Sequence, residues 1–375
     1  MKVFGPAALA EFLGDFVVYR NLAPLDPRLP SLDDLRRELG LPSRYLPRKA
    51  DREYAQAIAR ILEAAQALAH PGVRLARLLY LGDTRMLDST AFRNLKAQMS
   101  LPGWAFIASE NRRALKMVEQ EGDLFVANRW NAVADFLQFL EDQRFPLDEA
   151  TAGVVDMDKT AIGARGRNDR LIDQARVAAV RQTVEAVLGD AFHAPEFDAA
   201  YATLNQPAYH PFTADNQDYL AYICLMISAG VYDLPALLHD LTAGRMETFA
   251  QFIVTTDARV RQGVHAGVAE IHHQVWAYVQ QGDPTPFKAF RRNEYLATVA
   301  RMGHLDDSAS AGQLLEEEIV VTQEIREAAG HFLERGVLLF GLTDKPDEAS
   351  LPTPDLAAKG FVPLHRVRTH AVGET

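Results

Sequence analysis

The sequence has little cysteine, a deficit of positive charge and no long apolar run. Among 375 residues there is one cysteine, Cys224, which excludes an intramolecular disulfide and suits a reducing compartment. Lys and Arg number 39 against 50 Asp and Glu, and a net charge of -11 argues against nucleic acid as a partner. No run approaches the roughly 18 apolar residues of a membrane span, and the N-terminus lacks the pattern of a signal peptide. We therefore expect a cytoplasmic protein that binds neither membrane nor nucleic acid.

The sequence does contain enough apolar residues for a large folded core. Hydrophobic residues make up 48% of the chain, which indicates a globular protein. A chain of 375 residues exceeds one ordinary core, so two domains are expected. Nothing in the composition predicts the oligomeric state.

The most informative segment is Thr151-Ala-Gly-Val-Val-Asp156-Met-Asp158-Lys-Thr160. The apolar run at 152–155 has the length of a buried parallel strand. Asp156 and Asp158 lie on the same side of an extended chain, so one carboxylate can attack phosphorus while the other handles protons or a metal. The alternative is that these aspartates only cap the next helix. The glycines Gly163 and Gly166 that follow suit a mobile flap.

A second strand is predicted in Gly336-Val-Leu-Leu-Phe-Gly-Leu-Thr343-Asp-Lys-Pro-Asp. The preceding residues, 325–333, have apolar side chains at helical spacing, and Gly336 is a suitable C-cap. Thr343 then stands at the end of the strand. Alternatively, Thr343 or Asp344 caps a helix that has Pro346 in its first turn.

A third strand is predicted in Arg74-Leu-Ala-Arg-Leu-Leu-Tyr-Leu-Gly82-Asp83-Thr-Arg-Met-Leu-Asp88. Magnesium prefers hard oxygen ligands from separate loops, so Asp83 and Asp88 could join Asp156 around one Mg²⁺. A helix N-cap is the alternative for Asp83 alone.

Together these strings resemble motifs of the haloacid dehalogenase (HAD) superfamily of phosphohydrolases. The segment around Asp156 resembles the first motif, Thr343 the second, and Gly82-Asp83 with Asp88 the fourth. The third motif is a lysine before the fourth-motif strand, and Lys49 in Pro47-Arg48-Lys49 occupies that place. Arg48 or Arg52 could fill the role instead.

The motif order differs from that of the family. The family has the first motif, the second, the lysine and then Gly-Asp, whereas this chain has Lys49, Asp83, Asp156 and then Thr343. A circular permutation accounts for this order, since permutation is tolerated where termini lie close together. Lys49, Asp83, Asp156 and Thr343 should then converge at the C-terminal ends of adjacent parallel strands.

The resemblance implies an α/β core with a Rossmann-like parallel sheet and an inserted all-helical cap. The core is expected at 1–168 and 314–375, with an extension of unknown role at 1–43, and the cap at 169–313. Further strands are expected at 104–108 and 123–127, and 361–368 should form the other sheet edge. Cap helices are expected at 170–188, 218–228, 234–241, 260–281 and 286–302.

The resemblance also implies the chemistry. It makes the chain a Mg²⁺-dependent phosphatase of a small phosphorylated metabolite, with Asp156 as the nucleophile and Asp158 as the general acid and base. Thr343 and Lys49 would hold the phosphoryl group. Asp156, Asp83, Asp88 and the main-chain carbonyl of Asp158 would hold the metal.

Other functions remain open at the level of sequence. A phosphotransferase or mutase would use the same residues with a different acceptor. A noncatalytic ligand-binding protein with this fold is the alternative from another class, because fold does not fix function. In the predicted cap, His265, His272 and His273 fit packed or solvated histidines better than a zinc site. Lys288, Arg291 and Arg292 fit a solvated basic helix face better than an anion site.

Overall fold

The computed structural model describes residues 1–374, which divide into two compact units. Unit 1 comprises residues 1–175 with those from 298 onward, and unit 2 comprises residues 176–297. These limits differ from the predicted 169 and 313. The first turn of the helix at Arg170 is buried in unit 1 through Leu171 and Ile172. On the other side, Ile319 donates its backbone N–H to the carbonyl of Arg301.

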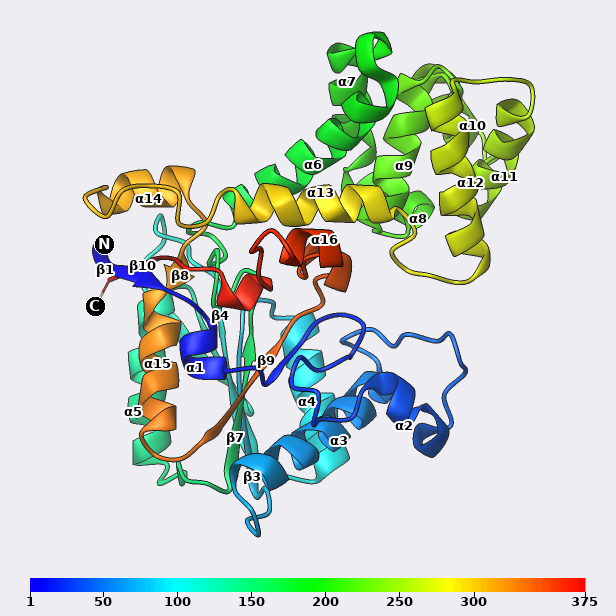
Figure 1. Ribbon diagram of the computed structural model, residues 1–375. Helices are drawn as coiled ribbons and strands as arrows, with labels where there is room; N and C mark the ends of the chain where they lie inside the picture. The colour runs from blue at the N-terminus through cyan, green and yellow to red at the C-terminus, as the bar shows by residue number, and fades with distance from the viewer. Residues whose placement is uncertain (375) are drawn as a thin grey trace. The chain divides into compact units, whose positions relative to one another are not determined.

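Unit 1 is an α/β structure around a seven-stranded sheet, which confirms the predicted fold class at that level (Figure 1). Its strand order is β2-β9-β7-β3-β4-β6-β5, and every neighbouring pair is parallel except β5 with β6. The strands are β2 Val17–Val18, β3 Arg77–Gly82, β4 Gly103–Ala108, β5 Val118–Glu121, β6 Leu124–Ala127, β7 Thr151–Asp156 and β9 Leu338–Leu342.

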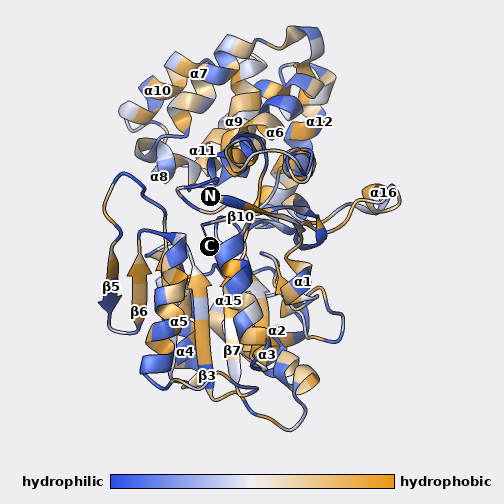
Figure 2. Cartoon of the chain, turned by 90° about the vertical axis from the view of Figure 1, so that its left-hand side faces the viewer, coloured by the Kyte–Doolittle hydropathy of each residue, from blue (hydrophilic) through white to orange (hydrophobic). Residues whose placement is uncertain are grey.

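Helices cover both faces of this sheet. The helices α3 (Arg52–Ala69) and α4 (Leu87–Met99) lie on one face, and α5 (Val133–Asp142) and α15 (Gln323–Leu333) on the other (Figure 1). Every residue of β7 and β9 is buried, as expected for central strands covered on both sides. In Figure 2, β3 is hydrophobic along most of its length, whereas the helices beside it are hydrophobic on one side only. Their apolar faces therefore form the core with the sheet.

The edge strand next to β9 comes from the N-terminal extension. Val17 and Val18 pair with Gly341 and Leu342, so the extension belongs to the sheet. The prediction of an edge strand at 361–368 is wrong, because this segment contains Pro363, which has no N–H to donate, and then a 3₁₀ turn, η5 (Leu364–Arg366).

A second, three-stranded sheet joins the two ends of the chain. β1 (Lys2–Ala7) pairs antiparallel with β10 (Thr369–Gly373), and β8 (Val321–Thr322) pairs with β10 in parallel. The remaining short helices of unit 1 are α1 Ala10–Leu13, α2 Leu32–Leu39, α14 Ala311–Glu317, η1 Trp130–Ala132, η4 Asp347–Ala349 and α16 Pro354–Ala357.

A hydrogen-bonded chain, buried at Tyr19 and His365, links the N-terminal segment to residues near the C-terminus. The Tyr19 hydroxyl lies 3.2 Å from His365 Nδ1, and His365 Nε2 lies 3.4 Å from Asp15 Oδ1. Burial lowers the pKa of His365 to about 4, although Asp15 opposes the shift. His365 is therefore neutral in the folded protein at neutral pH.

This burial predicts a loss of stability in mild acid. Below pH ~6.5 the unfolded chain protonates His365, while the folded protein resists protonation until about pH 4. The free energy of unfolding should therefore fall by about 3 kcal/mol across that window from this residue alone. Urea unfolding at several pH values gives the free energy of unfolding as a function of pH. This free energy should depend less on pH in His365→Gln than in the wild type, while the exposed-site control His193→Gln should keep the wild-type pH dependence. The same pH dependence of the free energy of unfolding in all three proteins would contradict the prediction.

Unit 2 is entirely helical, in agreement with the expectation for the insertion. Its helix α6 has the predicted limits, whereas the predicted helix at 260–281 begins later, because α11 ends at Val260 and Gly263 has a φ of 112°. No described helix of the protein is long and apolar enough to cross a membrane. The helices are α6 Arg170–Leu188, α7 Ala194–Leu204, η2 Gly189–Ala191, η3 Pro207–Tyr209, α8 His210–Thr213, α9 Gln217–Ser228, α10 Leu234–Thr242, α11 Phe249–Val260, α12 Ala266–Gln280 and α13 Lys288–Val299.

Two polar groups of unit 2 have structural partners. His272 is buried, and its Nδ1 lies 2.6 Å from the Tyr222 hydroxyl, which agrees with a packed histidine. Arg291 is also buried, and it forms ion pairs with Asp218 and Glu294. The expectation of a solvated basic face is therefore wrong for Arg291, since acids within its own unit neutralise it.

Candidate functional site

Three adjacent parallel strands end at the same edge of the sheet and carry the predicted site residues. β7 ends in Asp156, β3 is followed by Asp83, and β9 is followed by Thr343. In open α/β sheets, ligands bind at the carboxyl ends of the strands. The fold thus brings together residues that are far apart in the sequence.

Lys49 lies between two of the carboxylates. Its Nζ is 2.6 Å from Asp156 Oδ1 and 2.6 Å from Asp88 Oδ1, and all three side chains are buried. Arg48 and Arg52, the alternatives for this role, are exposed. The structure therefore places Lys49 in the cluster.

The turn after β3 is built around Asp88. Asp88 Oδ2 accepts backbone N–H groups from Asp83 at 3.0 Å and Thr84 at 2.8 Å. A Cβ atom on Gly82 would lie 2.7 Å from Asp88 Cγ, so only glycine allows this close approach. The N-cap of α4 is Met86, with no side-chain cap bond, so Asp83 does not cap the helix that follows it.

The segment after Asp158 is packed rather than a mobile flap. The Asn168 side chain donates to the carbonyls of Leu315 and Glu318 and accepts from the N–H of Val320. Gly166, at a φ of 76°, passes so close to the backbone of Glu110 that a Cβ would lie 2.0 Å from the Glu110 carbonyl oxygen. These contacts fix the segment.

The same segment delivers a second cation to the cluster. Arg165 Nε donates to Asp83 Oδ2. Behind it, Arg167 is buried between Glu110 and Glu324, neither of which has an exposed side chain. The loop is therefore held by a buried ion pair network next to the carboxylates.

The electrostatics of the cluster show an excess of negative charge. Burial raises the pKa of Asp83 to about 6, and the Asp88 carboxylate adds to this rise. Burial has the same effect on Asp88, but Lys49 outweighs it and lowers the pKa of Asp88 to about 2. Burial also raises the pKa of Asp156 well above its ordinary value, with Lys49 opposing and Asp88 and Asp83 adding to the shift. Lys49 and Arg165 supply two positive charges against three carboxylates.

The three carboxylates could hold a metal ion. One oxygen from each of Asp83, Asp88 and Asp156 lies within 4.8 Å of the others, and all three residues are buried. Hard oxygen ligands of this kind fit Mg²⁺. A divalent cation would also offset the unmatched negative charge. The Asp158 side chain lies outside this group, which leaves only its main-chain carbonyl as the predicted ligand.

One threonine hydroxyl contacts Asp156, and another follows the neighbouring strand β9. Thr160 Oγ1 donates to Asp156 Oδ2 at 2.7 Å. Thr343 is buried, and its Oγ1 accepts the backbone N–H of Lys345 at 3.1 Å. The turn η4 after Thr343 begins at Asp347 with no side-chain cap bond, so neither Thr343 nor Asp344 caps it.

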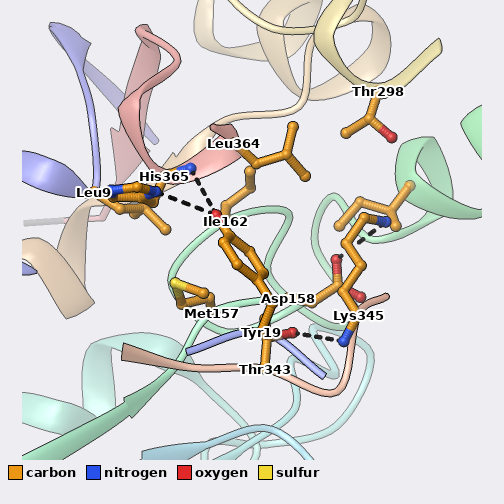
Figure 3. Close-up of a pocket in the computed structure, with 11 residues that line it drawn as sticks. Leu9, Tyr19, Met157, Asp158, Ile162, Thr298, Thr343, Lys345, Leu364 and His365 are labelled. Atoms are coloured by element: carbon orange, nitrogen blue, oxygen red, sulfur yellow. Dashed lines mark hydrogen bonds and ion pairs between the residues drawn. The ribbon is translucent and has the colours of Figure 1, made fainter. Parts of the chain in front are cut away.

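A small cavity opens beside these residues. Figure 3 shows Asp158 and Lys345 facing each other there, with the lysine Nζ 3.9 Å from Asp158 Oδ1. Residues from the N-terminal, central and C-terminal parts of the chain line this cavity. They are Leu9, Tyr19, Met157, Asp158, Ile162, Ile172, Thr298, Thr343, Lys345, Leu364 and His365.

Sequence reasoning assigned no role to Thr160, Arg165 or Lys345. Thr160 and Arg165 lie in the segment that follows β7, and Lys345 lies in the segment that follows β9. Their position in loops at the carboxyl edge of the sheet indicates that they could lie near the site. The sequence does not predict the direction in which a loop side chain points.

Comparison with known proteins identifies no relative: no family model, curated protein or solved structure matches this chain.

Proposed function

We propose that the chain is a Mg²⁺-dependent phosphatase that hydrolyses a small phosphomonoester through an aspartyl-phosphate. The observation that carries the proposal is the meeting of Asp156 with Lys49, Asp83 and Asp88 at the ends of adjacent strands. A buried nucleophile beside a lysine and two further acids is what phosphoryl transfer through a carboxylate needs.

We further propose that unit 1 is a HAD-type core with a circularly permuted motif order. The support is spatial. The strand that carries Asp156 has the Asp83 strand on one side and the Thr343 strand on the other, although Asp83 precedes Asp156 in the chain and Thr343 follows it. This strand order supports the proposal, because it puts the ends of the three strands side by side whatever their order in the chain. Unit 2 would correspond to the helical cap.

Asp83, Asp88, Asp156 and the carbonyl of Asp158 would hold the metal. When bound, Mg²⁺ supplies positive charge that offsets the phosphate oxygens and allows an anionic nucleophile to approach them. Lys49 and the Thr343 hydroxyl would hold the transferring phosphoryl group.

Asp156 and Asp158 would perform the nucleophilic attack and the proton transfers. An Asp156 oxygen attacks phosphorus as the bond from phosphorus to the leaving oxygen breaks, and Asp158 donates its proton to that oxygen. Asp158 then takes a proton from water, which attacks the aspartyl-phosphate, releases inorganic phosphate and restores Asp156. A transferase would pass the phosphoryl group to another hydroxyl at this second step.

Release of phosphate from a panel of phosphomonoesters tests the proposal. We expect turnover with Mg²⁺ and none in the presence of EDTA. Product analysis with added alcohols separates hydrolysis from phosphotransfer. A folded protein with no turnover on any member of the panel would favour a noncatalytic binding role, in which Lys49 and Arg165 merely neutralise the acids.

Metal binding can be tested without any substrate. Mg²⁺ at about 100 times its Kd should add about 2.7 kcal/mol to the free energy of unfolding and raise Tm. Asp83→Asn should abolish that rise, because it removes one of the three clustered carboxylates. The control Asp33→Asn changes a side chain that is 83% exposed and should keep the full rise. A wild-type Tm that does not respond to Mg²⁺ or Mn²⁺ would rule out the metal site.

A further inference from the structure

We propose that Lys345 and the cavity beside it select phosphomonoesters whose short leaving group carries a carboxylate. This inference rests on the proposed function, because it concerns the alcohol that leaves when Asp158 donates its proton. It assigns substrate recognition to unit 1, in the loop that follows β9.

Lys345 is a buried cation at the wall of the cavity. Its side chain is 4% exposed, and its Nζ lies 3.9 Å from Asp158 Oδ1, at the outer limit of an ion pair. Its backbone is fixed on both sides, since the N–H donates to Thr343 Oγ1 and the carbonyl accepts from the N–H of Arg20. The lysine backbone is thereby held next to Thr343, a residue of the proposed phosphoryl site.

The distance from Lys345 to Asp158 determines what the lysine can reach. A general acid must lie about 2.6–3.2 Å from the oxygen that it protonates. Lys345 Nζ is 3.9 Å from an oxygen of that same acid. The leaving oxygen and the ammonium group thus both lie near Asp158, so a carboxylate on a short chain attached to the leaving oxygen can reach the lysine.

The remainder of the cavity limits the size and polarity of the leaving group. Its volume is about 20 Å³, little more than the roughly 10–15 Å³ that one water molecule needs, so it has room only for a small terminal group such as a carboxylate. Leu9, Ile162 and Leu364 line it with apolar side chains (Figure 3), and Ile172 adds another. A carboxylate on a short carbon chain matches this combination of one cation and apolar surface.

The energetic effect follows from burial. A buried ammonium group is poorly screened by water, so it attracts an anion more strongly than a surface lysine does. A charge-assisted hydrogen bond of this kind corresponds to a gain of about 10- to 100-fold in kcat/KM for the carboxylated substrate. A cationic leaving group should be the poorest substrate, because it would approach the lysine with like charge.

The test compares three phosphomonoesters of equal length: 3-phosphonooxypropanoate, propyl phosphate and 3-aminopropyl phosphate. For the wild type we expect kcat/KM to fall in that order, with the first exceeding the second by about 10- to 100-fold. Lys345→Met keeps the side-chain length without the charge and should bring the ratio of the first two close to one. Lys359→Met, the same change at an exposed lysine, should leave the ratio as in the wild type.

The outcomes separate this inference from the proposed function. Absence of Mg²⁺-dependent turnover on all three esters and on 4-nitrophenyl phosphate would refute the function itself. Turnover of all of them by the wild type without preference for the carboxylate would overturn the assignment of Lys345 and leave the function standing. The same follows if Lys345→Met retains the wild-type ratio. Should that variant fail to fold, the wild-type order of the carboxylated, neutral and cationic esters decides alone.

Discussion

Asp156→Asn is expected to lower the rate of phosphate release by at least about 10⁴-fold while leaving the protein folded. The amide is a far weaker nucleophile than the carboxylate, so the aspartyl-phosphate cannot form. The fold should persist because Lys49 keeps its ion pair with Asp88, and the new amide oxygen can accept from Lys49 while the rotatable Thr160 hydroxyl turns to accept from the amide nitrogen. Steady-state phosphate release measures the loss, and circular dichroism with the unfolding midpoint confirms the fold.

The matched control for this substitution is Asp33→Asn. It makes the same chemical change at an exposed site outside the cluster and should keep wild-type activity. Retained turnover in a folded Asp156→Asn protein would exclude Asp156 as the nucleophile.

Asp158→Asn should lower kcat by about 10²- to 10⁴-fold for alkyl phosphates, because the leaving alkoxide loses its proton donor. The loss should be much smaller in the first step with 4-nitrophenyl phosphate, whose leaving group departs without a proton. A burst of nitrophenol followed by slow turnover would then be expected, since Asp158 is also needed to activate water. Rapid-mixing measurements resolve the two phases.

The dependence on the leaving group distinguishes acid catalysis from a structural role. A side chain that only supports the fold would affect alkyl and aryl esters equally. Equal losses for both substrates, with no burst, would therefore assign Asp158 to architecture. The same experiment on Asp33→Asn should give wild-type kinetics.

The strand ends could be predicted from the sequence because they combine two independent signals. Short apolar runs identified β3, β7 and β9, and the polar residue at the end of each run marked the edge of the sheet. The rule that parallel strands present their carboxyl ends together then placed Asp83, Asp156 and Thr343 near one another.

The edge strand next to β9 was not predictable in the same way. β2 is only two residues long, Val17 and Val18, so it gives no periodic signal, and its pairing with β9 is decided by tertiary contacts. The longer apolar stretch after Phe361 was the better candidate by pattern. Pro363 and the turn that follows it prevented that outcome.

The cations of the site were predictable only in part. Lys49 was identified from its place before the β3 strand. Arg165 and Lys345 depend on loop conformation, in the case of Arg165 on the neighbouring Gly166, which packs against the backbone of Glu110. Single-sequence reasoning has no access to such contacts, because they join residues that are far apart in the chain.

The pairing of β2 with β9 has a consequence for any shortened version of this protein. A chain that began at residue 44 would still contain every residue of the carboxylate cluster. It would nevertheless lose the carbonyl of Val18 that accepts the Thr343 N–H, the N–H of Arg20 that binds the carbonyl of Lys345, and the ring of Tyr19. Trimming the chain to the segment that carries the motifs would thus preserve the reactive side chains. It would remove the contacts that hold the loop after β9, which carries Thr343 and Lys345.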